Sequence, residues 1–141
     1  MSSWLKIDSD MVYSYLFYVV LGLFLFPFFQ YKLNLDAISY ISIAEKYGVG
    51  NIPDAINGYW GPLLSWLMTP ALFLGLDAVW SAKCLLLIIG AITLFQVRTL
   101  VDILGIKDIF RKVLLLISAL LILNYALTLI TPDLLLSLIH I

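Results

Sequence analysis

MVYSYLFYVVLGLFLFPFF, residues 11–29, is the stretch that decides the fold class. It has no charged residue, and as a helix it is long enough to cross roughly 30 Å of hydrocarbon. Pro27 stands in its last turn, where a break in the helix costs least. Two more apolar runs of similar length follow, at residues 79–97 and 113–130. We therefore expect an all-α, polytopic transmembrane helical bundle with three spans.

The composition supports a membrane protein. Of 141 residues, 63% are hydrophobic and 12% are charged, whereas soluble domains have roughly 45–50% apolar and about 25% charged residues. The balance of 8 basic and 9 acidic residues gives no positive field, so we expect no nucleic-acid partner. The single cysteine, Cys84, lies in an apolar run and is expected to be a small buried hydrophobic residue. The first span lacks a small-residue cleavage site, so we expect no cleavable signal peptide.

The polar stretch after the first span predicts a short helix over residues 36–47. At about 100° per residue, one face of that helix collects Asp36, Tyr40, Ile43 and Tyr47. Gly48 follows directly and is a typical C-terminal stop.

A second short helix is predicted over residues 62–74, where an apolar run is interrupted by Pro62 and Pro70. Such a segment is expected to lie at the membrane interface or to enter it partly. Two crossings then separate Asp36 from Asp133, so both face one compartment. The loop expected at residues 98–112 would lie on the cytoplasmic side with the N-terminal tail, because it holds half of the basic residues: Arg98, Lys107, Arg111 and Lys112. If residues 62–74 cross instead, Asp133 faces the opposite side, which fits the charges less well.

The order of motifs resembles a known family. Asp36 opens a short helix ending in AEKY (44–47), then come NGYWGPLLSWL (57–67), WSAK (80–83) before a span, and a Pro-Asp at 132–133. This order is similar to the GT-C superfamily of integral-membrane glycosyltransferases, in its protein-mannosyltransferase-like and aminoarabinose-transferase-like (family 39-type) branch. The resemblance covers residues 31–135. It implies that residues 1–135 are the N-terminal part of a GT-C transmembrane domain, and that this part is inactive alone.

The resemblance implies transfer of a sugar from a polyprenyl-phosphate donor to a lipid, glycan or protein acceptor at the extracytoplasmic face. Asp36 matches the first-loop carboxylate and would be the catalytic base; Asp133 matches the second-loop acid and would orient the acceptor or bind a cation. Tyr40 would line the pocket, and Lys46 or Lys83 would meet the donor phosphate. Each has a plainer alternative: both acids as helix caps, Tyr40 as an interfacial anchor, Lys46 as a solvated helix end, and Lys83 snorkelling to the headgroups.

Other interpretations stay open. Many members of the branch carry a second acid beside the first, whereas Ala37 follows Asp36 here, so no metal ligand is assigned, although a divalent cation is possible. A transporter or flippase, or a non-catalytic membrane subunit, would also fit an apolar chain, but the three spans show no charge at mid-membrane.

The last six residues, LSLIHI (136–141), resemble a translated sequencing adapter, and the alternative is the start of a fourth span. His140 is therefore not assigned a role. We expect a multi-pass protein of a bacterial or archaeal plasma membrane.

Overall fold

The chain folds into helices only, in the part that the structure describes. This computed structural model describes residues 9–140; the N-terminal tail of the topology prediction and the side chain of His140 lie outside the described residues. The helices are α1 (Ser9–Phe29), α2 (Leu35–Gly48), α3 (Ile52–Ala55), α4 (Leu63–Phe73), α5 (Ala78–Ile103), α6 (Asp108–Thr128) and α7 (Asp133–His140). Of these, α1, α5 and α6 are long and apolar enough to cross a membrane. The predicted all-α fold with three such helices is confirmed.

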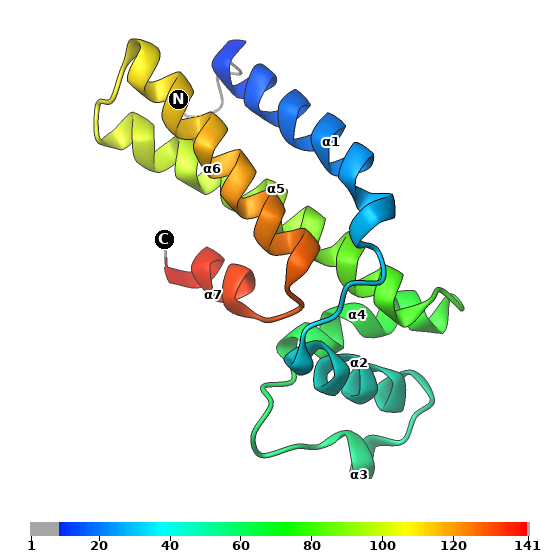
Figure 1. Cartoon of the computed structure of the whole chain (residues 1–141). Helices are drawn as coiled ribbons and strands as arrows, with labels where there is room; N and C mark the ends of the chain where they lie inside the picture. The colour runs from blue at the N-terminus through cyan, green and yellow to red at the C-terminus, as the bar shows by residue number, and fades with distance from the viewer. Residues whose placement is uncertain (1–8, 141) are drawn as a thin grey trace.

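The three long helices stand side by side (Figure 1). Helices α5 and α6 form an antiparallel hairpin, and α1 runs antiparallel to α5. The hydroxyl groups of Tyr15 and Tyr18 donate hydrogen bonds to the carbonyl oxygens of Ala91 (2.7 Å) and Leu87 (3.0 Å) on α5. Polar contacts of this kind hold helices together in lipid, where burial of apolar surface gives no driving force.

Gly90 lets α1, α5 and α6 approach one another closely. It is buried, and a Cβ atom at this position would lie 2.9 Å from a methyl carbon of Ile122 on α6 and closer still to the Tyr18 hydroxyl on α1. Real Cβ atoms do not show such contacts, so the Ile122 and Tyr18 side chains, or the helices that carry them, would have to shift. A residue without a side chain is therefore favoured where the helices meet.

Ion pairs close one end of the bundle, which we call the basic end. Arg111 on α6 pairs with Asp10 on α1 (2.8 Å) and with Asp102 on α5 (3.1 Å). Arg98 pairs with Asp102 one turn further along α5 (3.1 Å). The expected loop at 98–112 was wrong: α5 continues to Ile103 and α6 begins at Asp108. Arg98 and Arg111 lie within helices, and carboxylates on the same and neighbouring helices pair with them.

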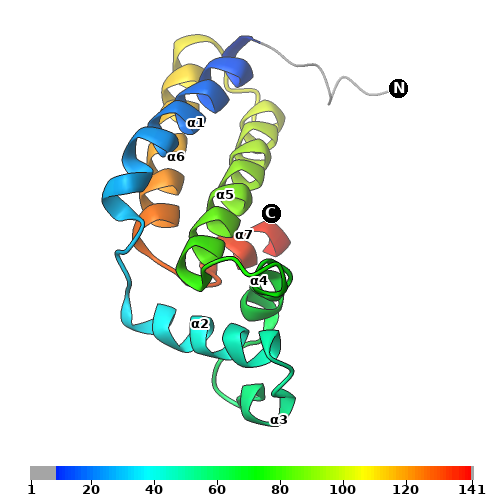
Figure 2. The ribbon, with the colours of Figure 1, turned by 90° about the vertical axis from the view of Figure 1, so that its right-hand side faces the viewer.

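The opposite end carries both aspartates of the sequence analysis, and we call it the carboxylate end. Here α2 lies crosswise below the long helices (Figure 2) and packs against α4. Ser65 on α4 donates a hydrogen bond to the backbone oxygen of Tyr40 on α2 (2.8 Å). At about 1.5 Å per residue, α4 is roughly 16 Å long, too short to cross a bilayer. The two predicted short helices are confirmed, and Asp36 and Asp133 lie at the same end.

Helix α7 turns back from the carboxylate end and packs against α5. The Gln96 side chain donates a hydrogen bond from Nε2 to the carbonyl oxygen of Leu138 (2.9 Å). Cys84 corrects a prediction: it is exposed on α5 instead of buried, because it lines an open groove between α4 and α5.

The two ends of the bundle are expected to face opposite sides of the membrane. Asp54→Cys, on α3, and Lys107→Cys, between α5 and α6, each introduce one exposed thiol in a Cys84→Ala background. An impermeant maleimide applied to intact cells should label position 54 at once and position 107 only after permeabilisation. Labelling of both from the same side contradicts this topology.

Gly90→Leu is expected to destabilise the bundle by about 1–3 kcal/mol, because it overfills the contact among three helices. Unfolding in detergent, followed by tryptophan fluorescence, measures the loss. Cys84→Leu puts the same side chain on an exposed position of the same helix and should leave stability nearly unchanged. Equal stability of the two variants would show that the close approach at Gly90 is not needed.

Candidate functional site

Asn34 joins the two loops that meet at the carboxylate end. It precedes α2, and its side chain accepts a hydrogen bond at Oδ1 from the backbone N–H of Ile130, just beyond α6 (2.8 Å). Asn34 does not cap α2 with its side chain. The bond brings the loop that carries Asp133 against the start of α2, which carries Asp36.

Two hydroxyl groups hold the carboxylate of Asp133. Tyr125 on α6 donates to its Oδ2 atom, and Thr131 does so at 3.0 Å. The hydroxyls of Tyr125 and Thr131 also contact each other. Asp133 is the first residue of α7, and its oxygens bind these side chains, not the N–H groups of the helix. Capping of α7 through the Asp133 side chain, the alternative considered from sequence, is therefore wrong.

Asp36 is a half-buried acid without a bound partner. It lies in the first turn of α2, and the residue at the N-cap position is Asn34, so Asp36 is not the cap considered from sequence. Among the described residues its carboxylate makes no hydrogen bond and no ion pair. A carboxylate free of internal partners can accept a proton from a bound molecule.

Tyr40 lies one turn after Asp36, on the same face of α2. Its side chain is 5% exposed and meets the ring of Trp60 edge-on, with centroids 5.2 Å apart. Trp60 meets Tyr59 in the same way at 4.9 Å. Burial, and then the negative charges of Asp36 and Asp133 and the nearby Tyr59, raise the pKa of the Tyr40 hydroxyl above its usual value. Both acids therefore lie near this phenol, whose ring also packs against Trp60.

The two lysines predicted to bind phosphate lie elsewhere. Lys46 is in the last turn of α2, about 15 Å along the helix from Asp36. Lys83 is completely buried, and its ammonium donates a hydrogen bond to the carbonyl oxygen of Leu127 at 2.6 Å. Snorkelling of Lys83 to the headgroups is thus wrong: the side chain turns inward because the last carbonyl groups of α6 lack partners within their own helix.

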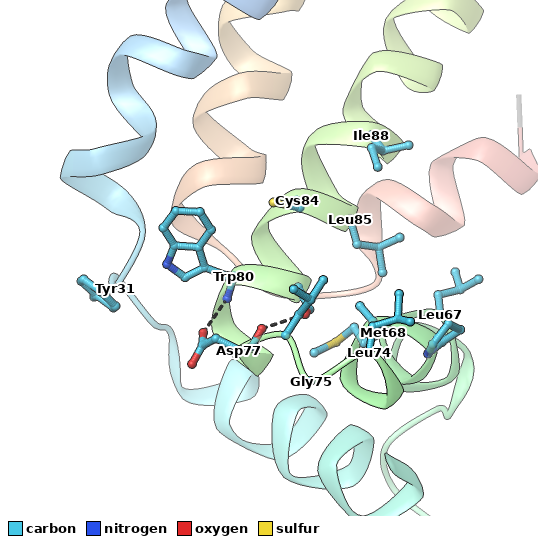
Figure 3. A pocket seen from close by; sticks show the side chains of 14 residues that line it. Tyr31, Leu67, Met68, Leu74, Gly75, Asp77, Trp80, Cys84, Leu85 and Ile88 are labelled. Atoms are coloured by element: carbon cyan, nitrogen blue, oxygen red, sulfur yellow. Dashed lines mark hydrogen bonds between the residues drawn. The ribbon is translucent and has the colours of Figure 1, made fainter.

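An apolar groove of about 700 Å³ lies between α4 and the first turns of α5 (Figure 3). Trp80, Cys84 and Ile88 line it along α5, and Met68 and Leu74 close it on the α4 side. Tyr31, on the linker between α1 and α2, also lines it, on the side of Trp80 (Figure 3). The groove follows α5 for about 16 Å, from Asp77 to Ile88. This length and lining suit an extended hydrocarbon chain.

The described residues include no cluster of three or more His, Cys, Asp or Glu side chains that would hold a metal ion. The site brings together Asp36, Tyr40 and Asp133 of the predicted residues and leaves Lys46 and Lys83 apart. Sequence reasoning missed Tyr125 and Thr131, which hold Asp133, and Asn34, which joins the loops. The position of Asn34 directly before a helix is typical of a capping residue, and it does not predict a bond to a distant loop.

Comparison of the chain with protein-family models, curated proteins and solved structures finds no match. The likeness to GT-C glycosyltransferases therefore remains a prediction from the motifs.

Asn34→Ala is expected to lower the free energy of unfolding by about 1–3 kcal/mol, because the N–H of Ile130, a fully buried residue, loses its partner. Thermal unfolding in detergent measures the change. Gln30→Ala, which removes an exposed bond within one turn of chain, is the matched control and should cost less. The same loss in both variants would show that the link between the loops contributes nothing.

Proposed function

We propose that this chain is part of a multi-pass membrane glycosyltransferase that moves a sugar from a polyprenyl-phosphate donor to a lipid, glycan or protein acceptor. The observation that carries the proposal is the half-buried carboxylate of Asp36, which has no partner among the described residues and lies beside Tyr40 at the end that also holds Asp133. The resemblance of the motifs to GT-C enzymes gives this arrangement its role.

In the proposed reaction Asp36 is the general base. An acceptor hydroxyl oxygen attacks the anomeric carbon of the sugar and its proton passes to Asp36. The bond from that carbon to the phosphate oxygen breaks, and its electron pair leaves with the polyprenyl phosphate. Asp133, held by Tyr125 and Thr131, orients the acceptor. No step requires a metal ion, and no metal ligand is assigned.

The apolar groove supports a lipid-linked donor. It begins at the carboxylate end and follows α5 toward the middle of the helix, so a polyprenyl chain can lie in it with its phosphate at the membrane surface. Lys32 is exposed on the linker, next in sequence to Tyr31, which lines the groove, and is the cation proposed to meet that phosphate. Membrane lipid and the donor are therefore the proposed partners.

The charges support an extracytoplasmic carboxylate end. The basic end gathers Arg98, Arg111 and Lys112 with Lys107, and basic residues favour the cytoplasmic side. A bacterial or archaeal plasma membrane is the proposed location, because polyprenyl-phosphate sugars are used at its outer face by the family that the motifs resemble.

One observation favours the alternative of a transporter or flippase. Lys83 is an ammonium completely buried within one of the long helices, and charges inside a membrane bundle often mark a substrate path. Sugar transfer separates the alternatives, since a transporter moves its substrate without forming a new glycosidic bond.

Asp36→Asn in the full-length protein is expected to lower the rate of sugar transfer by a factor of about 10² or more, because the amide cannot accept the proton. Asp133→Asn should have a milder effect, mainly on the use of acceptor. The measurement is transfer from a radiolabelled polyprenyl-phosphate sugar in membranes with matched protein levels.

Glu45→Gln is the matched control. It neutralises an exposed acid on the same helix and should keep the wild-type rate. Wild-type transfer by a folded Asp36→Asn variant would remove Asp36 from the mechanism, and absence of any transfer by the unaltered protein would contradict the proposed function.

A further inference from the structure

We propose that the carboxylate end binds a primary ammonium group between Asp36, Asp133 and the hydroxyl of Tyr40, beside the rings of Tyr59 and Trp60. The idea that the acceptor of the sugar carries this ammonium rests on the proposed function. Binding of the ammonium itself can be measured without any sugar transfer. Its source is an aminolipid headgroup, such as phosphatidylethanolamine, or a soluble amine.

Two polar groups at this end lack a partner within the described residues. Tyr40 is 95% buried by its neighbours, since only 5% of it is exposed, yet its hydroxyl makes no hydrogen bond there. Asp36 lies one turn away on the same face, and helical side chains lean toward the N-terminus, so the Tyr40 ring leans toward Asp36. The Tyr40 hydroxyl is not among the buried side-chain atoms that lack a partner, so it reaches the surface of the protein beside Asp36. One ligand can therefore bind both groups.

Asp133 supplies a third acceptor. Tyr125 and Thr131 both bind its Oδ2 atom, which leaves Oδ1 without a hydrogen bond from the described residues. The Asn34 contact with Ile130 fixes this loop against the start of α2. Asn34 is two residues before Asp36 and Ile130 is three residues before Asp133, so this hydrogen bond keeps the two acids at one end of the bundle, where Tyr40 also lies.

The charge of the two acids is uncompensated within the described part of the chain. The ion pairs that the structure gives all lie at the basic end, on Asp10 and Asp102. Lys46 is at the far end of α2, Lys83 is bound to Leu127, and Lys32, four residues before Asp36, has its ammonium over the Phe29 ring (5.5 Å from the centroid). Carboxylates that form no ion pair with these lysines are open to a cationic ligand.

The aromatic rings favour an organic cation over a metal ion. Tyr59 is 82% exposed and meets Trp60 edge-on, and Asn57 holds this turn by accepting from the N–H groups of both residues at 2.7 and 3.1 Å. Aromatic faces attract ammonium groups, whereas divalent cations require more oxygen ligands than two carboxylates and a phenol provide. A primary ammonium has three N–H donors, which matches the three acceptors.

Fluorine NMR of the chain labelled with 5-fluorotryptophan, in phosphatidylcholine nanodiscs, tests this site. The Trp60 resonance is assigned by its loss in Trp60→Phe, and those of Trp66 and Trp80 report on folding. Ethylammonium, tetramethylammonium and Mg²⁺ are titrated separately at constant ionic strength. We expect a saturable shift of the Trp60 resonance with ethylammonium alone. In Asp36→Asn/Asp133→Asn the midpoint should rise at least about tenfold.

Glu45→Gln/Asp54→Asn removes the same number of charges from exposed positions near this end and should keep the wild-type midpoint. Discs with phosphatidylethanolamine distinguish the sources: a Trp60 resonance already shifted before titration identifies the lipid headgroup, and an unshifted one that still responds to ethylammonium identifies a soluble amine.

The inference is overturned if neither ethylammonium nor phosphatidylethanolamine shifts the Trp60 resonance, or if tetramethylammonium or Mg²⁺ does so as well as ethylammonium. Sugar transfer that depends on Asp36 without any response to ammonium leaves the proposed function in place and removes this inference. Binding of ammonium without any sugar transfer supports this inference and contradicts the proposed function.

Discussion

The close contact among α1, α5 and α6 at Gly90 is the constraint on which the rest of the structure depends. In lipid, helices gain little from burying apolar side chains, so tight packing and a few polar bonds must hold them. Tyr15 and Tyr18 provide such bonds on either side of Gly90, to the carbonyl oxygens of Ala91 and Leu87. The spacing of the three helices set here fixes where their loops meet at both ends.

At the carboxylate end, that spacing brings together residues that are far apart in sequence. Asn34 reaches Ile130, and Tyr125 and Thr131 hold Asp133. Asp36 and Tyr40 come from α2, which α4 supports from beside it. The two acids thus lie at the same end of the bundle because the long helices determine where α2 and α7 begin.

The sequence predicted the features that depend on local pattern. Apolar length marked α1, α5 and α6, prolines marked α4 as too short to cross, and a period of about 100° put Tyr40 on the face of Asp36. It failed where a distant partner decides. Arg98 and Arg111 look like loop residues until Asp102 and Asp10 pair with them. The inward turn of Lys83 depends on a carbonyl group of α6, which no pattern around Lys83 reveals.

The ion pair between Arg111 and Asp10 also has a consequence for biogenesis, because the two residues are 101 positions apart. When α1 enters the membrane, neither Arg111 nor the α5 carbonyl groups that bind Tyr15 and Tyr18 have yet been synthesised. Until those residues are made, α1 has no partner for the Asp10 carboxylate or for the hydroxyl groups of Tyr15 and Tyr18. Its docking is a late event, completed when the α5–α6 hairpin has been inserted, and during that interval water, lipid headgroups or the insertion machinery must provide the missing polar contacts.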